Sequence, residues 1–385
     1  MSQPAQLQAD RGNARLKFLD RYAGIPVLAG LGIARHARGL HHVPPGWKTI
    51  GLVKTVGIGD TVLLSAVIHD IRDARPDARI VLFVSANNAG FARLLDDVDA
   101  IVVLPVRNIP AALRLLRAEH CDVVVDFGAW PRLESLFTVL SGAACTVGMR
   151  TKGQHRHYAY DVVVDHGTGH EIDNYRRLVA AVGIDSTSVP MLHADPAAPR
   201  PLATRYVVLH LWPGGANFDE RSWPADRWRA VAAAMNDRGF EVVLTGGPGD
   251  VGPTRALVAD WRAIGIRARS AAGTTPTETL VWLHFASGVI SVNTGVMHLA
   301  AAVGTPIVAL NGPTPVARWG PVGAPSRSVV SPMVPEGYLN LGWEQDDRFR
   351  DAMSEITVDT VVSAWDELMA EADDGEGDAS EEATS

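Results

Sequence analysis

Residues 291–314 combine residue types that could bind a phosphate group. Their pattern predicts a strand end, a tight turn at Thr294-Gly295, a short helix of small residues and a second apolar strand. A helix that begins at such a turn presents unpaired backbone N–H groups and the positive end of its dipole, where phosphate binds well. We therefore interpret Thr294, Gly295 and the amides that follow as a diphosphate site.

Two side chains flank this turn. His298 lies within the first turn of the predicted helix, close enough to add a hydrogen bond to the same ligand. The alternative is a histidine that has only a structural role in its own domain. Asn293 immediately precedes the turn and carries a hydrogen-bonding amide but no charge.

Asp60 is the candidate general base. It lies in the segment 54–61, at the first turn between a predicted strand and a predicted helix. A helix N-terminus tends to keep a carboxylate ionised, and an ionised carboxylate that faces a cleft can accept a proton from a substrate hydroxyl. The alternative is a helix N-cap, a position that Asp often fills. A dinucleotide-binding fold is disfavoured, because Val62 stands where the fingerprint needs a third glycine.

Two further loops could contact a ligand. The first follows a predicted strand at 206–210 and contains three residues whose backbone could approach a ligand, Pro213, Gly214 and Gly215. Arg221 in this loop could clamp a phosphate, although a surface arginine is the alternative. The second loop follows a strand that begins at residue 241, and it could line a nucleotide through Thr245, Gly246 and Gly247.

Several other chemistries have no signature in the sequence. It contains no Walker loop, no His-Glu-x-x-His, no cysteine pairs for zinc and no Gly-x-Ser-x-Gly elbow. Asp97 and Asp99 have the spacing of a metal-binding pair, but they precede their strand, so we interpret them as a solvated loop and predict no metal site. Cys121 and Cys145 are interpreted as buried reduced thiols, with a disulfide or a nucleophile as the alternatives.

The length and charge of the chain bound its organisation. Two domains of ordinary size fit 385 residues, and a net charge of −8 without a basic stripe argues against a nucleic-acid partner. From residue 49, short apolar runs alternate with helical stretches, which predicts parallel strands with crossover helices. The predicted boundaries are a domain at 49–195, a Pro- and Ala-rich linker at 189–201, a second domain at 202–330, a loop and helix at 331–372 and an acidic disordered tail at 373–385.

Residues 1–48 form a lead-in in which basic and apolar residues alternate. A helix that lies on a membrane surface is one interpretation, and a helix that packs on its own domain is the other. The apolar run at 22–33 is too short to span a bilayer, and the polar N-terminus lacks the order of a signal peptide.

These motifs, in this order, resemble glycosyltransferase family 9, the ADP-heptose–lipopolysaccharide heptosyltransferases and their relatives. The resemblance extends over residues 49–321, and its most specific block is the segment 293–314. The matching residues are Gly59 and Asp60, the run 212–216 (Trp-Pro-Gly-Gly-Ala), Arg221, Trp223 and Pro224, the run 245–248 (Thr-Gly-Gly-Pro), the run 293–298 (Asn-Thr-Gly-Val-Met-His), Gly304 to Pro306 and Gly312 to Thr314.

The resemblance implies a GT-B fold, in which two Rossmann-like parallel-sheet domains face each other across a cleft. It implies inverting, metal-independent sugar transfer without a cofactor, with Asp60 as the base and Lys54, Gly59 and Thr61 on the acceptor side. The donor would be a nucleotide-diphosphate sugar, with an ADP-sugar favoured, and the acceptor a glycan or glycolipid of the cell envelope. The donor would contact Pro213, Gly214, Gly215, Arg221, Thr245, Gly246, Gly247, Asn293, Thr294, Gly295 and His298. The implied location is the cytoplasm, either free or at the inner face of the plasma membrane.

Two residues depart from the pattern of the family. Asn293 stands where the family usually has Asp, which predicts a different donor sugar or nucleotide, and Arg221 stands where it often has Lys, which preserves a phosphate clamp. A nucleotide-sugar epimerase or hydrolase of the same fold, and a non-catalytic nucleotide-sugar-binding protein, are the alternative functions.

Overall fold

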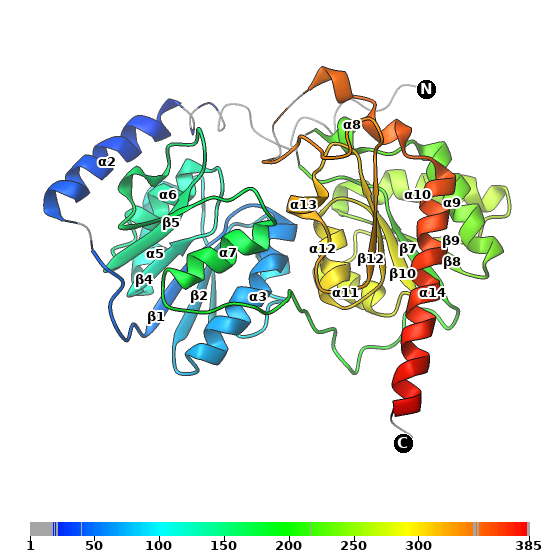
Figure 1. Ribbon diagram of the computed structural model, residues 1–385, viewed down its shortest axis with the longest axis horizontal. Coiled ribbons are helices and arrows are strands. Elements are labelled where there is room, and N and C mark those ends of the chain that lie inside the picture. Colours follow the sequence, from blue (N-terminus) through cyan, green and yellow to red (C-terminus); the bar gives the residue numbers. More distant parts are fainter. Residues whose placement is uncertain are drawn as a thin grey trace. The chain divides into compact units, whose positions relative to one another are not determined.

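The computed structural model of the protein describes residues 18, 20, 22–39, 41–215, 217–341, 344 and 346–382. Contacts divide the chain into two compact units, Met1–Val189 (unit 1) and Pro190–Ser385 (unit 2), shown in Figure 1. The division falls at the beginning of the predicted linker. The predicted lead-in is part of unit 1, and the predicted C-terminal loop, helix and tail are part of unit 2.

Unit 1 contains a sheet of six parallel strands in the order β3-β2-β1-β4-β5-β6. The central strands are continuous apolar runs because helices cover the sheet, and this pattern is typical of parallel sheets. The strands are β1 (Thr49–Val53), β2 (Arg79–Val84), β3 (Ala100–Val103), β4 (Val123–Asp126), β5 (Cys145–Arg150) and β6 (Val162–Asp165). The helices are α2 (Gly24–Arg38), α3 (Ile58–Ala74), α4 (Ala89–Ala92), α5 (Ile109–Ala118), α6 (Arg132–Val139), α7 (Glu171–Ala180) and the short η1 (His157–Ala159).

Unit 2 repeats this topology, with six parallel strands in the order β12-β11-β10-β7-β8-β9. The strands are β7 (Tyr206–His210), β8 (Glu241–Gly246), β9 (Ala268–Ala272), β10 (Gly288–Val292), β11 (Ile307–Asn311) and β12 (Ser326–Val330). The helices are α8 (Phe218–Arg221), α9 (Ala225–Asp237), η2 (Pro248–Asp250), α10 (Val251–Ala263), α11 (Pro276–His284), α12 (Gly295–Ala302), α13 (Val316–Trp319), η3 (Asp347–Phe349), η4 (Ala352–Glu355) and α14 (Val358–Glu382).

Both sheets have the Rossmann strand order, in which the first strand lies beside the fourth. The predicted α/β class with two Rossmann-like parallel sheets is therefore confirmed. The strands β9 and β12 at the edges of the second sheet were missed, because residues 268–272 and 326–330 carry arginine and serine instead of a continuous apolar run.

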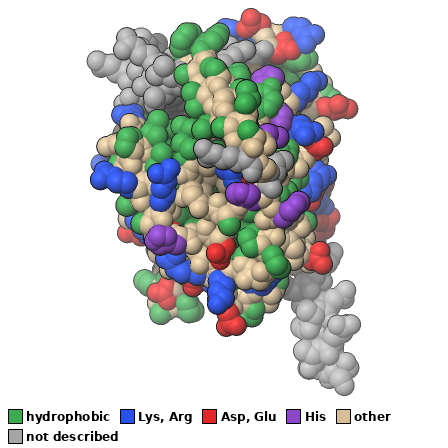
Figure 2. All heavy atoms as spheres, turned by 90° about the vertical axis from the view of Figure 1, so that its left-hand side faces the viewer, with side chains coloured by type: hydrophobic (Ala, Val, Ile, Leu, Met, Phe, Trp, Pro, Cys, Tyr) green, Lys and Arg blue, Asp and Glu red, His purple; other side chains and the backbone are tan. Residues whose placement is uncertain are grey.

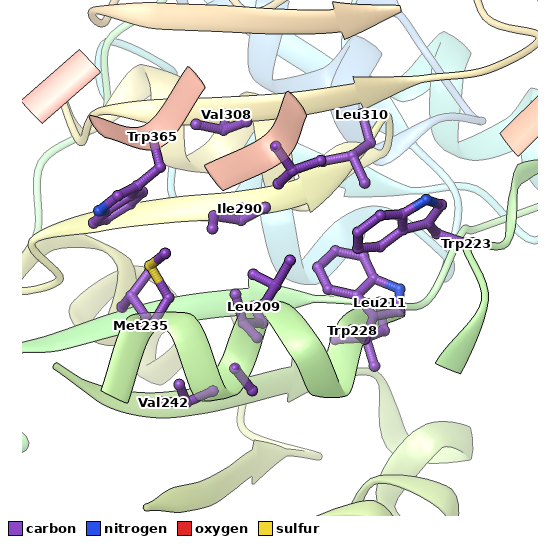
Figure 3. Close-up of a cluster of buried hydrophobic side chains, with 14 of the residues drawn as sticks. Leu209, Leu211, Trp223, Trp228, Met235, Val242, Ile290, Val308, Leu310 and Trp365 are labelled. Atoms are coloured by element: carbon purple, nitrogen blue, oxygen red, sulfur yellow. The ribbon is translucent and has the colours of Figure 1, made fainter. Parts of the chain in front are cut away.

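The core of unit 2 is rich in tryptophan (Figure 3). Trp223 and Trp228 pack edge to face with ring centroids 5.0 Å apart, and the Trp223 Nε1 donates to the carbonyl of Ile356 at 3.0 Å. Trp365 on α14 packs in the same core, against Phe240. The C-terminal helix is thus an integral part of unit 2.

Helix α14 is longer than the sequence predicted. It extends to Glu382 and so includes residues 373–382, which the sequence predicted as part of an acidic disordered tail. In the described part of the chain, no helix is both long enough and apolar enough to cross a membrane. Helix α2 packs on unit 1, as one of the two interpretations of the lead-in predicted.

Candidate functional site

Each sheet has a point where the direction of strand progression reverses, between β1 and β4 in unit 1 and between β7 and β10 in unit 2. In sheets of this kind, ligands bind beyond the carboxyl ends of the strands at this reversal. Lys54 and Asp60 follow β1, and Thr294 and Gly295 follow β10. The residues that the sequence singled out therefore lie at the reversal point of their own sheet.

Asp60 is held by two donors. Its Oδ1 accepts from Lys54 Nζ at 2.6 Å and from the hydroxyl of Tyr175, on α7, at 3.0 Å. Lys54 is almost fully buried, whereas the Asp60 side chain is 22% exposed. Burial disfavours the charge on Lys54, but the Asp60 carboxylate outweighs this effect with help from Glu134 and Glu171, and the pKa of Lys54 is raised. The pair is thus an ammonium and a carboxylate, and the carboxylate reaches solvent.

The backbone before Asp60 explains how its side chain is positioned. Gly57 is the N-cap of α3 and has a φ of 87°, which a side chain would strain, and a Cβ atom there would collide with Asp60 Oδ2. Gly57 fills the N-cap position and Asp60 is the third residue of the helix, so Asp60 is not the N-cap that the alternative predicted. Its carboxylate folds back over the glycine and faces Lys54 instead.

The predicted acceptor-side neighbours differ in accessibility. Thr61 is fully buried, and its hydroxyl donates to the Gly57 carbonyl and accepts from Asn88 Nδ2 at 2.9 Å. Gly59 is half-buried in the first turn of α3. Thr61 therefore supports the turn. Of Gly59, Asp60 and Thr61, only Asp60 has a polar side chain that reaches solvent.

A buried polar network behind this pair was missed from the sequence. Glu134, in the first turn of α6, accepts from the backbone N–H of Thr55 at 2.6 Å and from its hydroxyl at 2.7 Å. Burial, and secondarily the Asp126 carboxylate, raise the pKa of Glu134 to about 7. Its Oε2 is buried and has no hydrogen-bond partner among the residues that the structure describes. Glu134 thus anchors the residue next to Lys54, and the neutral acid is favoured by its surroundings.

The same network contains a fully buried ion pair. Arg156 contacts Asp126 at the end of β4 and donates to the carbonyl of Gly128 and to Ser135 Oγ. The hydroxyl of Tyr160 also donates to Asp126. These residues fix the loop after β4, whose Phe127 carbonyl accepts from Lys54 at 3.2 Å. The signal that could have found them is an acidic residue at the end of an apolar strand.

The predicted phosphate site in unit 2 is built from backbone turns. Thr294 is the N-cap of α12, with an extended backbone and a half-buried side chain, and Gly295 is the first residue of the helix. A Cβ atom on Gly214 would lie 3.7 Å from Thr294 Oγ1, which places the loop after β7 beside this turn. Gly214 and Gly215 are exposed. The amides at the start of α12 therefore adjoin an accessible glycine loop.

Arg221 joins this site. Its Nη2 donates to the Gly214 carbonyl, and a Cβ atom on Gly215 would lie 3.7 Å from it. Gly215 has a φ of 78°, so the turn that brings the two together favours glycine. Of the predicted donor residues, the structure thus brings Gly214, Gly215, Arg221 and Thr294 together.

The second predicted loop makes several contacts within unit 2. The Thr245 hydroxyl contacts Nδ1 of His210 at 2.9 Å, and both residues are buried. Burial lowers the pKa of His210 to about 4, so its imidazole is neutral. A Cβ atom on Gly246 would press on Trp212, and the Gly247 amide donates to Asp250 Oδ2 at 2.9 Å. That amide is therefore already bonded within the protein.

Asn293 and His298 are both buried, and Pro213 is buried at the base of the glycine loop. The Asn293 Nδ2 donates to Asn311 Oδ1 at 2.8 Å and to the Trp319 carbonyl at 3.0 Å. These bonds tie the turn before α12 to β11 and α13. The side-chain amide of Asn293 is thus engaged inside unit 2.

The remaining candidates do not gather into a site. Among the described residues, no three His, Cys, Asp or Glu side chains cluster as metal ligands would. Asp97 contacts His69 at 3.1 Å, and Asp99 contacts Arg72 at 2.7 Å. Cys121 and Cys145 are free and buried, and burial raises the pKa of their thiols to about 12 and about 11, as expected for inert reduced cysteines.

Comparison with protein families and curated proteins gives consistent matches. The model of glycosyltransferase family 9 (heptosyltransferase) matches residues 109–336. Lipopolysaccharide heptosyltransferase 3 of Escherichia coli is 23% identical over 337 residues, which cover 81% of this chain and 96% of that protein. Lipopolysaccharide heptosyltransferase 1 of Salmonella typhimurium is 28% identical over 142 residues, 37% of this chain and 41% of that protein.

Solved structures share the fold. A family 9 glycosyl transferase from Veillonella parvula has a TM-score of 0.70 and 20% identity, with 86% of this chain and 99% of that chain covered. The E. coli heptosyltransferase WaaC with ADP has a TM-score of 0.66 and 20% identity, covering 83% and 99%. The same enzyme with ADP-2-deoxy-2-fluoro heptose has a TM-score of 0.62 and 19% identity, with the same coverage. These matches support the predicted GT-B architecture.

Proposed function

The chain belongs to glycosyltransferase family 9, and from this membership we propose that it moves a heptose or a related sugar from a nucleotide diphosphate to a glycan or glycolipid of the cell envelope. The relatives are named for lipopolysaccharide heptosyl transfer, which supports a lipopolysaccharide-type acceptor. The solved relative that holds ADP and an ADP-sugar analogue supports an ADP-sugar donor. A cytoplasmic location at the inner face of the plasma membrane suits such a donor and acceptor.

The observation that carries this proposal is the Asp60 carboxylate, held by Lys54 and Tyr175 at the reversal point of unit 1. In the proposed step, the acceptor hydroxyl oxygen attacks the anomeric carbon, and Asp60 takes the proton of that hydroxyl. The bond from the anomeric carbon to the diphosphate oxygen breaks, and its electron pair leaves with the diphosphate. Attack from the side opposite to the leaving group inverts the anomeric centre.

The leaving diphosphate gains negative charge as the bond breaks. The amides at the start of α12, together with Thr294 and Arg221, provide a dipole end, a hydroxyl and a fixed cation for that charge. Preorganised donors of this kind stabilise a developing anion better than mobile water does. We propose that they serve this role in place of a metal ion.

The lysine beside the base fits this chemistry. A cation 2.6 Å from Asp60 Oδ1 interacts favourably with the ionised carboxylate. Such a base accepts the proton late, when the attacking oxygen has become acidic through bond formation to the sugar. Lys54 is then left beside a neutral acid and supports the return of Asp60 to its ionised form.

A donor screen followed by a turnover assay tests the proposal. Nucleotide-diphosphate sugars are screened by thermal shift, because a ligand that binds the native state raises its melting temperature. We expect the largest shift from an ADP-sugar, and turnover of this donor only when a lipopolysaccharide-core acceptor is present. NMR of the product should show the inverted anomer, and the rate should be unchanged by EDTA.

Three outcomes would contradict this function. Rapid donor conversion without an acceptor would favour an epimerase or hydrolase. Tight donor binding without turnover over a broad acceptor panel would favour a non-catalytic sugar-nucleotide sensor. A rate that falls with EDTA and recovers with a divalent cation would contradict metal independence.

A further inference from the structure

Helix α2 has an unusual outer face. The helix covers residues 24–38, and its exposed positions are almost all apolar, whereas a surface helix ordinarily turns polar residues outward. Ile33 is 74% exposed and Val27 is 48% exposed, and Tyr22, just before the helix, is 62% exposed. Figure 2 looks onto this side of the molecule, where hydrophobic side chains gather in the upper part of the view.

The inner face of α2 is firmly attached to unit 1. Leu28 is buried among Val139, Ala159 and Tyr160. Arg35 forms an ion pair with Asp161 and donates to the Val139 carbonyl at 3.2 Å. The inner face therefore keeps α2 packed on unit 1 while the apolar outer face remains exposed. The helix can contact a partner without leaving unit 1.

Gly32 shows how closely the helix approaches. A Cβ atom at this position would collide with the carbonyl oxygen of Tyr158. Gly30, on the outer face, has open space around it instead. Gly32 and Gly30 thus mark the inner and outer sides of the helix.

The charge of this region differs from that of the rest of the chain. Residues 11–48 contain seven Lys and Arg and a single acidic residue, Asp20, although the whole chain carries a net charge of −8. Asp20 itself is engaged, since it accepts from Arg132 at 3.1 Å and from the backbone of Leu133 at 3.0 Å. An apolar face within a basic segment is complementary to an anionic lipid surface, where the apolar side chains enter the interface and the cations meet the headgroups.

The place of α2 in unit 1 suits such a surface. Asp20 contacts the first turn of α6, which begins beyond the carboxyl end of β4. Glu134 of the same turn holds Thr55, next to Lys54. Asp20, just before α2, is therefore docked near the carboxyl end of the sheet that carries Asp60. This step rests on the proposed function, because a glycolipid acceptor would have to reach that end of the sheet.

From these observations we infer that the outer face of α2, with Val27 and Ile33, and Tyr22 just before the helix bind the surface of a bilayer that contains anionic lipids. The helix lies in the interface and does not cross it. Unit 1 is thereby held with its acceptor edge near the headgroups, from which a glycolipid acceptor projects.

Vesicle flotation with the purified full chain tests this inference, with no donor or acceptor present. We expect the protein to float with vesicles of phosphatidylglycerol and phosphatidylcholine and to remain behind with phosphatidylcholine alone. Ile33→Glu should weaken binding by at least about tenfold, because it replaces a side chain whose burial in the interface is favourable by a charge that opposes it. High salt should also weaken binding.

Ile264→Glu is the matched control. Ile264 is 63% exposed on unit 2, so the same substitution there tests exposed hydrophobicity in general. This variant should float like the wild type, and both variants should keep the wild-type melting temperature. A neutralised flank, Arg15→Gln with Lys17→Gln and Arg21→Gln, should lose preference for the anionic vesicles.

The inference is overturned if the wild type floats with neither vesicle, or if Ile33→Glu floats as well as the wild type does. It is also overturned if the wild type forms a dimer in solution that Ile33→Glu dissociates, while neither binds vesicles, since the face would then join two copies of the chain. Because flotation needs no turnover, the vesicle-binding result can be interpreted even if the proposed transferase activity is not found. A failure to bind vesicles likewise leaves the activity assay unaffected.

Discussion

The two units have the same strand order but very different chemistry at the reversal points of their sheets. In unit 1 this point is occupied by ionised side chains, Lys54 and Asp60, with Glu134 buried behind them. In unit 2 it is occupied mainly by backbone, the exposed glycines after β7 and the start of α12, with Arg221 as the charged side chain beside them. Topology therefore fixes where a ligand can bind in each unit, and local sequence fixes what kind of ligand it can be.

The difference follows from what each half of the proposed reaction needs. A base must be held with its charge intact, which requires a counter-ion and a rigid support. A diphosphate already carries charge and needs donors that accommodate it, which glycine turns and a helix N-terminus provide without a side chain in the way. The comparison predicts that substitutions in unit 1 act on the chemical step, and that substitutions in unit 2 act on donor binding.

Asp60→Asn is the strongest test of the first half. The amide keeps an acceptor for Lys54 and Tyr175 but cannot take a proton, so we expect the transfer rate to fall by about 10²–10⁴-fold. Donor affinity should stay within about twofold, since unit 2 is unchanged. The measurement is kcat with saturating donor, alongside the donor Kd from calorimetry.

Asp73→Asn is the matched control for this variant. Asp73 lies on the same helix, α3, and its side chain is 70% exposed, so the same loss of charge there should leave kcat unchanged. Wild-type turnover by Asp60→Asn would remove Asp60 as the base. A loss of donor binding as large as the loss of rate would contradict the division of roles between the units.

Glu134→Gln tests whether the buried support of unit 1 titrates. A carboxyl whose pKa rises from 4.5 to about 7 on folding binds more protons in the folded than in the unfolded protein, so its contribution to stability is full below pH 4.5 and is lost as pH rises through about 7. Between these values the wild type should lose up to about 3 kcal/mol relative to the variant. Urea unfolding of both proteins from pH 4.5 to 8 measures the difference.

Glu336 is exposed and has no comparable burial, so Glu336→Gln should give a stability difference from the wild type that changes little over the same range. A pH-independent difference between the wild type and Glu134→Gln would show that Glu134 does not change its protonation in this window. A difference that grows in the opposite direction would mean that the folded state favours the ionised form.

Arg221→Ala tests the second half. Loss of a charge-assisted hydrogen bond to a phosphate is worth roughly 1.5–3 kcal/mol, so we expect the donor Kd to rise by about 10–100-fold. Arg229→Ala, an exposed arginine on α9, is the matched control and should bind donor normally. An unchanged donor Kd in Arg221→Ala would show that Arg221 is a surface residue that does not bind the donor phosphate.

Sequence patterns predicted the fold class because parallel strands of this kind are continuous apolar runs at regular spacing. They also pointed to Asp60 and to Thr294-Gly295, because a turn after a buried strand that combines glycine with a polar residue has few structural explanations. What they could not supply is the partner of each residue. Tyr175 lies 115 positions from Asp60, and nothing local to it indicates the contact.

The buried network behind Lys54 could be predicted only in part. Asp126 at the end of an apolar strand is a signal, but nothing in the sequence indicates its partner Arg156, and only the fold pairs the two in the interior. The accessibility of neighbours was also unpredictable, since Thr61 faces inward and Asp60, one position before it, reaches solvent. Contacts between residues far apart in the chain determine which side chains are buried, and a single sequence does not reveal these contacts.

The smallest expected effect concerns Asn293, a polar side chain next to the backbone donors of unit 2. This residue departs from the family's usual Asp, and the sequence suggested that the donor would differ as a result. In the structure its Nδ2 donates to Asn311 Oδ1 and to the Trp319 carbonyl, so its amide supports the turn from within unit 2. An aspartate here would place a carboxylate oxygen next to these two acceptor oxygens and would lose both hydrogen bonds.

Asn293→Asp should therefore act on stability and not on specificity. We expect the free energy of unfolding to fall by about 1–3 kcal/mol, the cost of a buried polar group that loses its partners. The ratio of kcat/KM between two nucleotide-sugar donors should move by less than about threefold. Asn340→Asp, an exposed position in unit 2, should change neither quantity. If the ratio of kcat/KM between the two donors inverts while stability is unchanged, the Asn293 side chain contacts the donor. Donor recognition in unit 2 would then depend on this side chain as well as on the backbone amides.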